Sequence, residues 1–329
     1  MGLTCGVSIS SPPTGRSHTL RGYLFIAAAG LCWGISATLG RAVFTGRLLG
    51  GAVHPIHPLI LAQSRTTISF LVLMPVLLAR RGAGMFCMAW RDFWLSLALG
   101  VLGMASSNFF YYLAIQRTNV ATAITLQYTA PILVLLYMLA RGRQRATLRR
   151  AGSVFLAVLG IALTIGIVGR GRFHLDTVGL LAAEIAAVSF AYYNVAGSQL
   201  LERYDRWRIL LIALLAASVF WQCVNPPWKI SAVHYSGAEW GFMTVFAVTS
   251  VLLPFSLYFG GLQYLDATRA IVTSCLEPVF SIAIASAVLG ELLSWWQIGG
   301  IAVVLAATIT VQLPEGVKEL RPVVLEPIE

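Results

Sequence analysis

The sequence is poor in charged residues, and above all in acidic ones. Charged residues make up 11% of its 329 residues and hydrophobic residues 58%, whereas soluble domains carry about 25% and roughly 45–50%. This balance excludes an ordinary soluble domain and indicates a protein of the lipid bilayer. Only 13 Asp and Glu oppose 23 Lys and Arg, for a net charge of +10. Because the basic residues lie between apolar runs, we attribute them to membrane topology and expect no nucleic acid partner.

Metal-ligand clusters and catalytic motifs are also missing from the sequence. It contains no C-x-x-C pair, no H-E-x-x-H, no G-x-S-x-G and no nucleotide-binding G-x-x-x-x-G-K-[ST], so we predict no enzyme, no metal site and no cofactor. Any energy for work across a membrane must then come from a solute or ion gradient. The five cysteines are scattered and predict no disulfide framework: Cys5, Cys32, Cys87, Cys223 and Cys275.

Long apolar runs are what the sequence has instead. Runs of about 20 apolar residues can cross the roughly 30 Å of hydrocarbon in a bilayer. Three of the runs reach spanning length only if one charged residue is admitted inside each, namely Arg65, Glu184 and Glu277. We therefore predict an all-α integral membrane protein with ten transmembrane helices. The ten runs are 22–40, 58–79, 93–116, 118–140, 151–169, 177–201, 209–228, 240–265, 270–290 and 292–314.

The distribution of basic residues predicts the topology. With the amino terminus in the cytoplasm, the cytoplasmic segments collect 16 Lys and Arg and the opposite segments six. Short cytoplasmic loops carry such an excess, and an even number of spans puts both termini on the same side. We expect a multi-pass protein of a bacterial inner membrane with both termini in the cytoplasm, and a monomer.

The two halves of the chain resemble each other at an offset of 147 residues. With five helices in each half, the second copy must begin on the opposite side of the membrane, which makes the repeat inverted, as in many transporters. We divide the chain into a polar tail 1–20, a first half 21–169, a second half 170–313 and a second tail 314–329. The matching pairs are Tyr111 with Tyr258, Gln116 with Gln263, Asn119 with Asp266, Ile124 with Ile271, and Pro131 with Pro278.

Several of these motifs together resemble the EamA branch of the drug/metabolite transporter superfamily. They are Trp33-Gly34, Arg65, the stretch from Ala114 to Pro131, Tyr264-Leu265-Asp266-Ala267, Leu276-Glu277-Pro278-Val279-Phe280, Leu289-Gly290-Glu291 and Gln297-Ile298-Gly299-Gly300. The resemblance covers about residues 20–313 and implies ten helices in two inverted halves of a carrier.

The first half departs from the family pattern. Arg141-Gly142-Arg143 stands where the family has a Glu, and Ala130 stands at the position matching Glu277. Two symmetric acidic sites are therefore in doubt. The segment His54-Pro55-Ile56-His57-Pro58 and the aromatic-rich third and sixth spans resemble bacterial exporters of aromatic amino acids.

The three charged residues inside the spans are the first candidate site residues. Glu277 needs a partner, a proton or water, since a carboxylate in the membrane is costly, and Ser274 shares its helix face. It is either a cavity-lining, proton-sensitive carboxylate or half of a helix-packing ion pair. Arg65 either binds a substrate carboxylate or neutralises Glu277 or Glu184. Glu184 on the sixth span, with Tyr192 at the edge of its face, stays equally open between function and packing.

Neutral polar and aromatic residues complete the predicted site. Phenols deep inside a span need a partner or water, and a cavity of aromatic rings and neutral hydrogen-bonding groups suits amphipathic zwitterions. The predicted lining residues are Trp33, Ser36, Asn108, Tyr111, Tyr112, Gln127, Glu184, Tyr192, Tyr258, Ser274 and Glu277.

The leading hypothesis is a secondary transporter that exports amino acids, aromatic and other neutral ones, and related small metabolites across the inner membrane. It works by alternating access, either facilitated or ion-coupled. Its partners are the small-molecule substrate and the lipid bilayer. An exporter of nucleobases, sugars or cationic drugs, a channel and a non-transporting membrane scaffold remain the alternatives.

Overall fold

The computed structural model describes residues 16–44, 56, 58–117, 126–144, 147–164, 176–289 and 294–312. Within these ranges the chain forms helices joined by turns and loops, and no strand. The elements are α1 (Arg16–Phe44), α2 (Pro58–Arg81), η2 (Ala83–Phe86), α3 (Trp90–Ala98), η3 (Leu99–Ala105), α4 (Ser106–Arg117), α6 (Ala130–Ala140), α7 (Leu148–Thr164), α9 (Thr177–Leu201), α10 (Arg206–Val224), α11 (Pro227–Ser231), α12 (Gly237–Ala247), η4 (Val248–Leu252), α13 (Leu253–Leu262), α14 (Ala267–Ser274), α15 (Leu276–Leu289) and α16 (Trp295–Gln312).

The all-helical membrane fold predicted from the sequence is confirmed. A helix satisfies its own backbone groups, which lipid cannot do, so apolar runs of this length become helices. Each of the ten predicted runs contains at least one helix. Among the described residues, six helical stretches are long and apolar enough to span a membrane by themselves, and α6 and the Ile298–Val311 part of α16 are shorter apolar helices. The count of ten spans stays a prediction.

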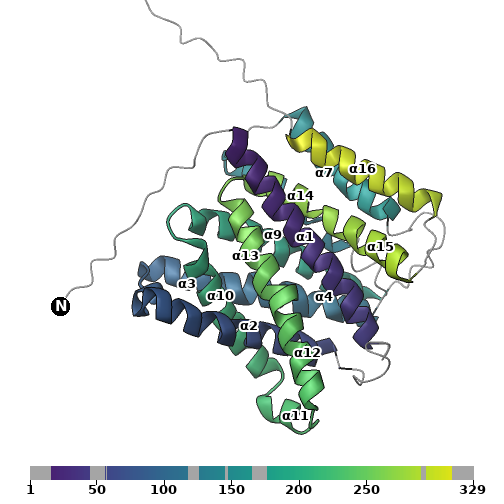
Figure 1. The fold of residues 1–329 in the computed structure, drawn as a ribbon. Helices are drawn as coiled ribbons and strands as arrows, with labels where there is room; N and C mark the ends of the chain where they lie inside the picture. The colour runs from purple at the N-terminus through teal and green to yellow at the C-terminus, as the bar shows by residue number, and fades with distance from the viewer. Residues whose placement is uncertain are drawn as a thin grey trace, which may run out of the picture.

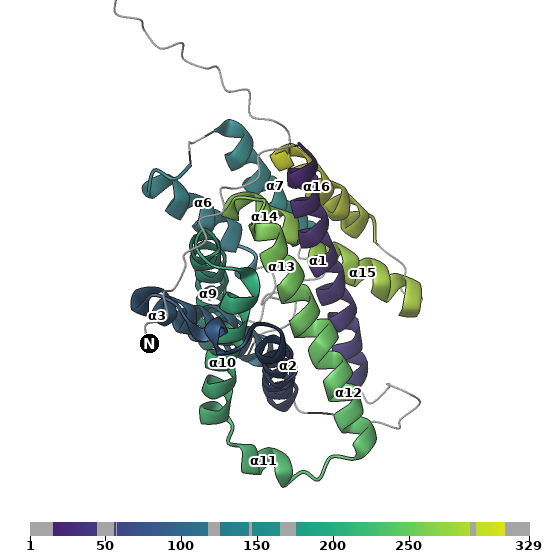
Figure 2. The same ribbon diagram turned by 60° about the vertical axis from the view of Figure 1, so that its left-hand side comes forward.

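The helices interleave the two halves of the sequence. In Figures 1 and 2, α1 lies beside the continuous rod formed by α12, η4 and α13, and α7 lies against α16 at one margin of the molecule. The largest apolar cluster draws on both halves, with Ile26 of α1 and Leu99 of η3 packed together with Tyr193 of α9 and Trp221 of α10. Because the core is shared, neither half has its own complete core.

Two π-helical segments stand at nearly equivalent places in the two halves. η3 interrupts the third predicted span, and η4 interrupts the eighth. η3 packs on α9 and α10, whereas η4 packs on α1 and α2. This reciprocal packing, each segment against the first two helices of the other half, is what an inverted repeat produces.

The close approach of η3 to α10 depends on a glycine. A Cβ atom at Gly100 would lie 2.2 Å from the carbonyl oxygen of Ala213. Small residues allow such contacts between backbones in membrane helices. The packing therefore requires glycine at this position.

Helices α2 and α10 form an antiparallel pair that is tied at both ends. At one end Arg81 makes an ion pair with Asp205, the residue that precedes α10. At the other end the amide of Gln63 donates to the carbonyl oxygen of Asn225 at 2.7 Å, and Asn225 donates back to Gln63 Oε1 at 2.7 Å. Gln222 joins this second group by accepting from Gln63 at 2.9 Å.

Candidate functional site

The fourth and ninth predicted spans are both broken at equivalent places. In the first half, a turn at Tyr128 and Thr129 precedes α6, which has Pro131 in its first turn. In the second half, Cys275 separates α14 from α15, which has Pro278 in its first turn. Proline lacks the backbone donor that a continuous helix needs, but it fits the first turn of a new one. Breaks at corresponding positions of two inverted halves are the usual mark of a transporter's binding region.

The two breaks meet through a hydrogen bond. The hydroxyl of Tyr128 donates to Oε2 of Glu277 at 2.9 Å. Tyr128 is buried and Glu277 is partly exposed, and Tyr128 packs in one apolar cluster with Cys275 and Leu276. A carboxylate at the end of the second break is therefore held by a phenol from the first break.

Arg65 is held near this contact by Asn108. Its guanidinium donates to Oδ1 of Asn108 at 2.5 Å, and the amide nitrogen of Asn108 donates to the carbonyl oxygen of Met104 at 2.7 Å. Met104 belongs to η3, so the π-helical segment orients the asparagine that orients the arginine. The positive charge of Arg65 acts on Glu277, and Tyr111 lies close to Tyr128.

The described residues thus gather opposite charges and neutral donors in one neighbourhood. The direct hydrogen bonds take Arg65 to Asn108 and Glu277 to Tyr128, whereas the attraction between Arg65 and Glu277 acts at longer range. Their predicted role as a charge pair remains a prediction. Gln127, next to Tyr128, donates to Ser107 Oγ at 3.2 Å and extends the polar group along α4.

An aromatic cluster lies between the halves on α1, α9 and α13. The ring of Trp33 lies 5.3 Å from that of Phe255 and 5.5 Å from that of Tyr258. Tyr258 is 0% exposed, its hydroxyl donates to Asn194, and it also interacts with Ser274. Both partners of its hydroxyl belong to the second half and satisfy the buried phenol. Tyr258 therefore contacts the first half through its ring, which packs near Trp33.

Other predicted site residues are more scattered. Ser36 of α1 donates to the carbonyl oxygen of Cys32 at 2.7 Å and lies 3.5 Å from that of Thr249 in η4. Tyr192 is partly buried, and Glu184 lies on the exposed face of α9 with Leu181 and Val188. The side chain of Tyr112 lies outside the described residues. No group of His, Cys, Asp and Glu within the described ranges could hold a metal ion.

Sequence reasoning missed Tyr128 as the partner of Glu277, and it also missed Ser107 and Asn194. The pairing of Pro131 with Pro278 could have pointed to Tyr128. A proline in the first turn marks a new helix, and the side chain just before that helix can point toward a neighbouring segment. Asn194 had no comparable signal, because its contact with Tyr258 joins residues 64 positions apart.

The chain is similar to known membrane transporters. The model of the EamA-like transporter family matches residues 20–166 and again residues 177–313. The chain belongs to this family. Two successive matches agree with the repeat inferred from the 147-residue offset, and membership identifies a membrane transporter and not an enzyme.

Relatives of this EamA-like chain are also transporters by name. It is 25% identical over 228 residues to the threonine/homoserine exporter RhtA of Escherichia coli K12, which covers 67% of this chain and 72% of the relative. It is 21% identical over 302 residues to the uncharacterized inner membrane transporter YicL of Salmonella typhimurium LT2, covering 90% and 96%. A crystal structure with 21% identity matches with a TM-score of 0.70 over 89% of this chain and 96% of that one, which shows the same fold.

Together these findings make the chain a multi-pass membrane transporter of a small molecule. The orientation of the termini, the domain boundaries and the narrower resemblance to exporters of aromatic amino acids stay predictions.

Proposed function

We propose that this EamA-like protein exports neutral α-amino acids, aromatic ones included, by exposing one site alternately to the two sides of the membrane. The observation that carries the proposal is the contact between Tyr128 and Glu277 at the two helix breaks, with Arg65 and Asn108 nearby. The similarity to RhtA, named as an exporter of threonine and homoserine, supports the same class of substrate.

An α-amino acid carries the two charges that this site can complement. Its ammonium would bind the carboxylate of Glu277, and its carboxylate would bind the guanidinium of Arg65. Without substrate, Tyr128 holds the Glu277 oxygen that the ammonium would take over. The attraction of Arg65 for Glu277 would stabilise the empty site. Binding therefore exchanges internal contacts for substrate contacts and leaves no charge unpaired, which limits the cost of desolvation.

Side-chain selectivity would be loose. Apolar walls discriminate between substrates by only about 10–200-fold per methylene, and the predicted lining includes the rings of Trp33, Tyr111 and Tyr112 together with Gln127. An acidic side chain would meet Glu277, and a basic one would meet Arg65. We therefore expect threonine, homoserine, methionine and phenylalanine to share the site, while aspartate and lysine are excluded.

Counterflow in proteoliposomes tests the proposal. Vesicles preloaded with unlabelled threonine or phenylalanine should take up the labelled form, and Glu277→Gln and Arg65→Gln should each lower this uptake at least about tenfold, since each removes one charged contact. The matched control is Glu184→Gln. The sequence placed this carboxylate in the predicted lining, but it lies on the exposed face of α9, so the variant should retain most of the uptake.

Other outcomes would overturn parts of the proposal. Transport of a nucleobase, a sugar or a cationic drug with no counterflow of any neutral amino acid would reject the substrate class. Ionic conductance without saturation would indicate a channel, and neither activity would indicate a scaffold. If Glu277→Gln transported normally, the carboxylate would only pack the helices.

A further inference from the structure

The 147-residue offset pairs the first turns of α3 and α12, and each has an acidic residue at its third position. α3 begins after Ala89 and has Asp92 as its third residue, while α12 begins after Ser236 and has Glu239 as its third residue. Both acids are buried, with exposed fractions of 6% and 3%. The first turn of a helix leaves backbone N–H groups without partners, and an acid at the third position can accept from them.

The start of α12 is satisfied within its own helix. The backbone N–H of Ser236 donates to Oε2 of Glu239 at 2.6 Å, and the backbone N–H of Glu239 donates to Oγ of Ser236 at 3.3 Å. These two bonds form a complete capping box.

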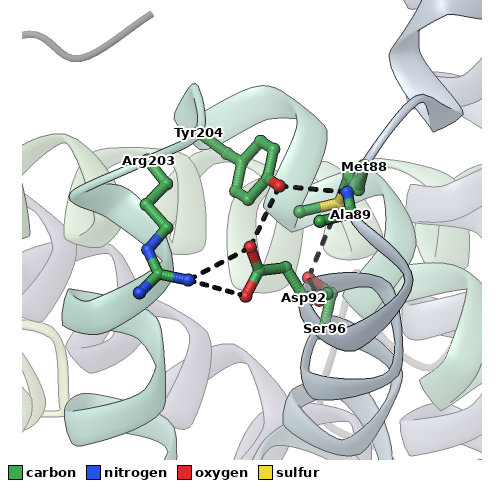
Figure 3. Close-up of polar contacts among 6 residues, drawn as sticks. All are labelled: Met88, Ala89, Asp92, Ser96, Arg203 and Tyr204. Carbon is green, nitrogen blue, oxygen red and sulfur yellow. Dashed lines mark hydrogen bonds and ion pairs between the residues drawn. The ribbon is translucent and has the colours of Figure 1, made fainter. Parts of the chain in front are cut away.

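The start of α3 is completed by the other half of the chain. Ala89 has no side-chain oxygen, and the carboxylate of Asp92 is one methylene shorter than that of Glu239. Figure 3 shows the hydroxyl of Tyr204 between the two groups: it accepts from the N–H of Ala89 at 3.1 Å and donates to Oδ2 of Asp92 at 3.0 Å. Tyr204 lies between α9 and α10, so a phenol of the second half bridges the capping box of a first-half helix.

Neighbouring residues strengthen this contact, which we call the α3 junction (Cys87, Ala89, Asp92, Arg203, Tyr204 and Arg208). Arg203 Nη1 lies 3.2 and 3.3 Å from the two carboxylate oxygens of Asp92; in Figure 3 Arg203 lies to the left of the acid and Tyr204 above it. Arg208 donates to the carbonyl oxygen of Cys87 at 2.7 Å. The side chain of Arg203 is 59% exposed, so the junction borders on water.

We propose that the α3 junction is a latch that closes the predicted cytoplasmic side of the transporter and is released when that side opens. The proposal rests on alternating access, the proposed mode of function. Release leaves the carboxylate of Asp92 and the N–H of Ala89 to water, which already reaches the exposed side chain of Arg203. Water can replace each lost bond at a small net cost. The latch is thus strong enough to hold a closed state and weak enough to open in each cycle.

Three variants separate the latch from ordinary helix capping. Tyr204→Phe removes the bridging hydroxyl and keeps the ring. The double variant Ala89→Ser/Asp92→Glu gives α3 the residues with which α12 caps itself, so α3 should no longer need Tyr204. The matched control is Ser236→Ala, which weakens the cap of α12 without crossing between the halves.

Hydrogen exchange followed by mass spectrometry in lipid nanodiscs reads the latch directly. Tyr204→Phe should speed exchange about tenfold both at the start of α3 and at residues 202–208, as expected for the loss of a bridging hydrogen bond. The double variant should speed exchange at 202–208 by a similar factor while the start of α3 stays as protected as in the wild type. Ser236→Ala should affect only the start of α12. If residues 202–208 stay protected in the double variant, or if Ser236→Ala exposes them equally, the proposal is wrong.

Transport then tests whether the latch opens in the cycle. With labelled threonine and phenylalanine as probes, the double variant should change the counterflow rate severalfold with an unchanged half-saturating concentration. An unchanged rate, alongside faster exchange at 202–208, would show that the junction is only a structural brace. If the wild type transports neither probe, the proposed substrate class fails, while the exchange measurement still decides whether Tyr204 couples the halves.

Discussion

The α3 junction has an equivalent at the opposite end of the molecule, and the two are built from different chemistry. At this second contact, the α12 junction, Ile56 and Leu61 of the first half pack against Met243 and Phe246 of α12. Its acid, Glu239, is used inside its own helix, whereas Asp92 is shared with the second half. One contact between the halves is therefore apolar and the other is polar, although the repeat places an acid at the same helix position in both.

The difference sets how each contact can open. Apolar burial is non-directional and loses stability in proportion to the area uncovered. The hydrogen bonds of a buried acid are directional, and bonds to water can replace them once water reaches the acid. The α12 junction should therefore contribute more to overall stability, and the α3 junction should respond more to the aqueous phase beside it.

The largest effect should come from emptying the apolar junction. Phe246 is 3% exposed, and truncating a buried phenylalanine to alanine costs about 3 kcal/mol or more through the cavity that it leaves. We expect Phe246→Ala to lower the free energy of unfolding in detergent by this amount, measured by denaturant titration. Phe242→Ala, which truncates a partly buried neighbour, should cost less. If Phe246→Ala lowered the free energy of unfolding by less than a single substitution at the α3 junction, the comparison would be reversed.

Removing the acids should rank second and should separate the two junctions. Asp92→Asn weakens bonds to both Tyr204 and Arg203 in a buried place and should cost about 2 kcal/mol. Glu239→Gln keeps an acceptor for its own helix and should cost about 1 kcal/mol or less. Thermal melting of the two variants side by side gives the difference. Equal losses would mean that Asp92 does no more than cap α3.

Alkaline pH should have a smaller effect, which both junctions share through a buried or partly buried tyrosine. Burial, together with Asp92, raises the pKa of Tyr204, although the N–H of Ala89 opposes this; burial and Glu239 raise the pKa of Tyr235. The neutral phenols therefore contribute stability that is complete below about pH 10, the pKa of an unfolded tyrosine, and is lost as the pH rises through the folded pKa. Between about pH 9 and pH 11 the melting temperature should fall less steeply in Tyr204→Phe and in Tyr235→Phe than in the wild type. A slope that neither variant changes would show that other groups govern the alkaline transition.

The smallest effect should come from the ion pair between Arg81 and Asp205. Both side chains are well exposed, at 45% and 38%, and exposed pairs contribute about 0–1 kcal/mol. Arg81→Gln should lower the melting temperature slightly at low salt, and about 0.5 M salt should reduce the difference because it screens exposed charges. A large loss that persists in high salt would place this pair among the buried contacts.

Much of this architecture could be predicted from the sequence, because lipid forces apolar runs into helices. The pairing of Pro131 with Pro278 was also visible in the sequence, but the helix breaks beside the two prolines were not predicted from it. The π-helical segments could not be predicted, since no residue pattern marks them. The extra residue in a π-helical turn rotates all later side chains by about 100° around the helix axis. The face that Asn108 and Tyr111 share in α4 therefore could not be extended back through η3 from the sequence.

The bridging role of Tyr204 was equally invisible in the sequence. Asp92 and Tyr204 are 112 positions apart, and Tyr204 lies in a loop where an aromatic residue is an ordinary interfacial anchor. The clue was local and negative: an alanine stands before α3 where a serine stands before α12. An unsatisfied helix start must find a partner elsewhere, but only the folded chain shows where.

Helices α2 and α10, tied to each other at both ends, correspond under the repeat and therefore flank its pseudo-two-fold axis. Gln63 and Asn225 hold one end, and the weaker pair of Arg81 and Asp205 holds the other. We therefore expect the two helices to tilt together, as one beam. A beam about 30 Å long that tilts by about 10° about its centre moves each end by roughly 2.6 Å. The α3 and α12 junctions lie at opposite ends of this beam, so a modest rocking motion would loosen one while it tightens the other.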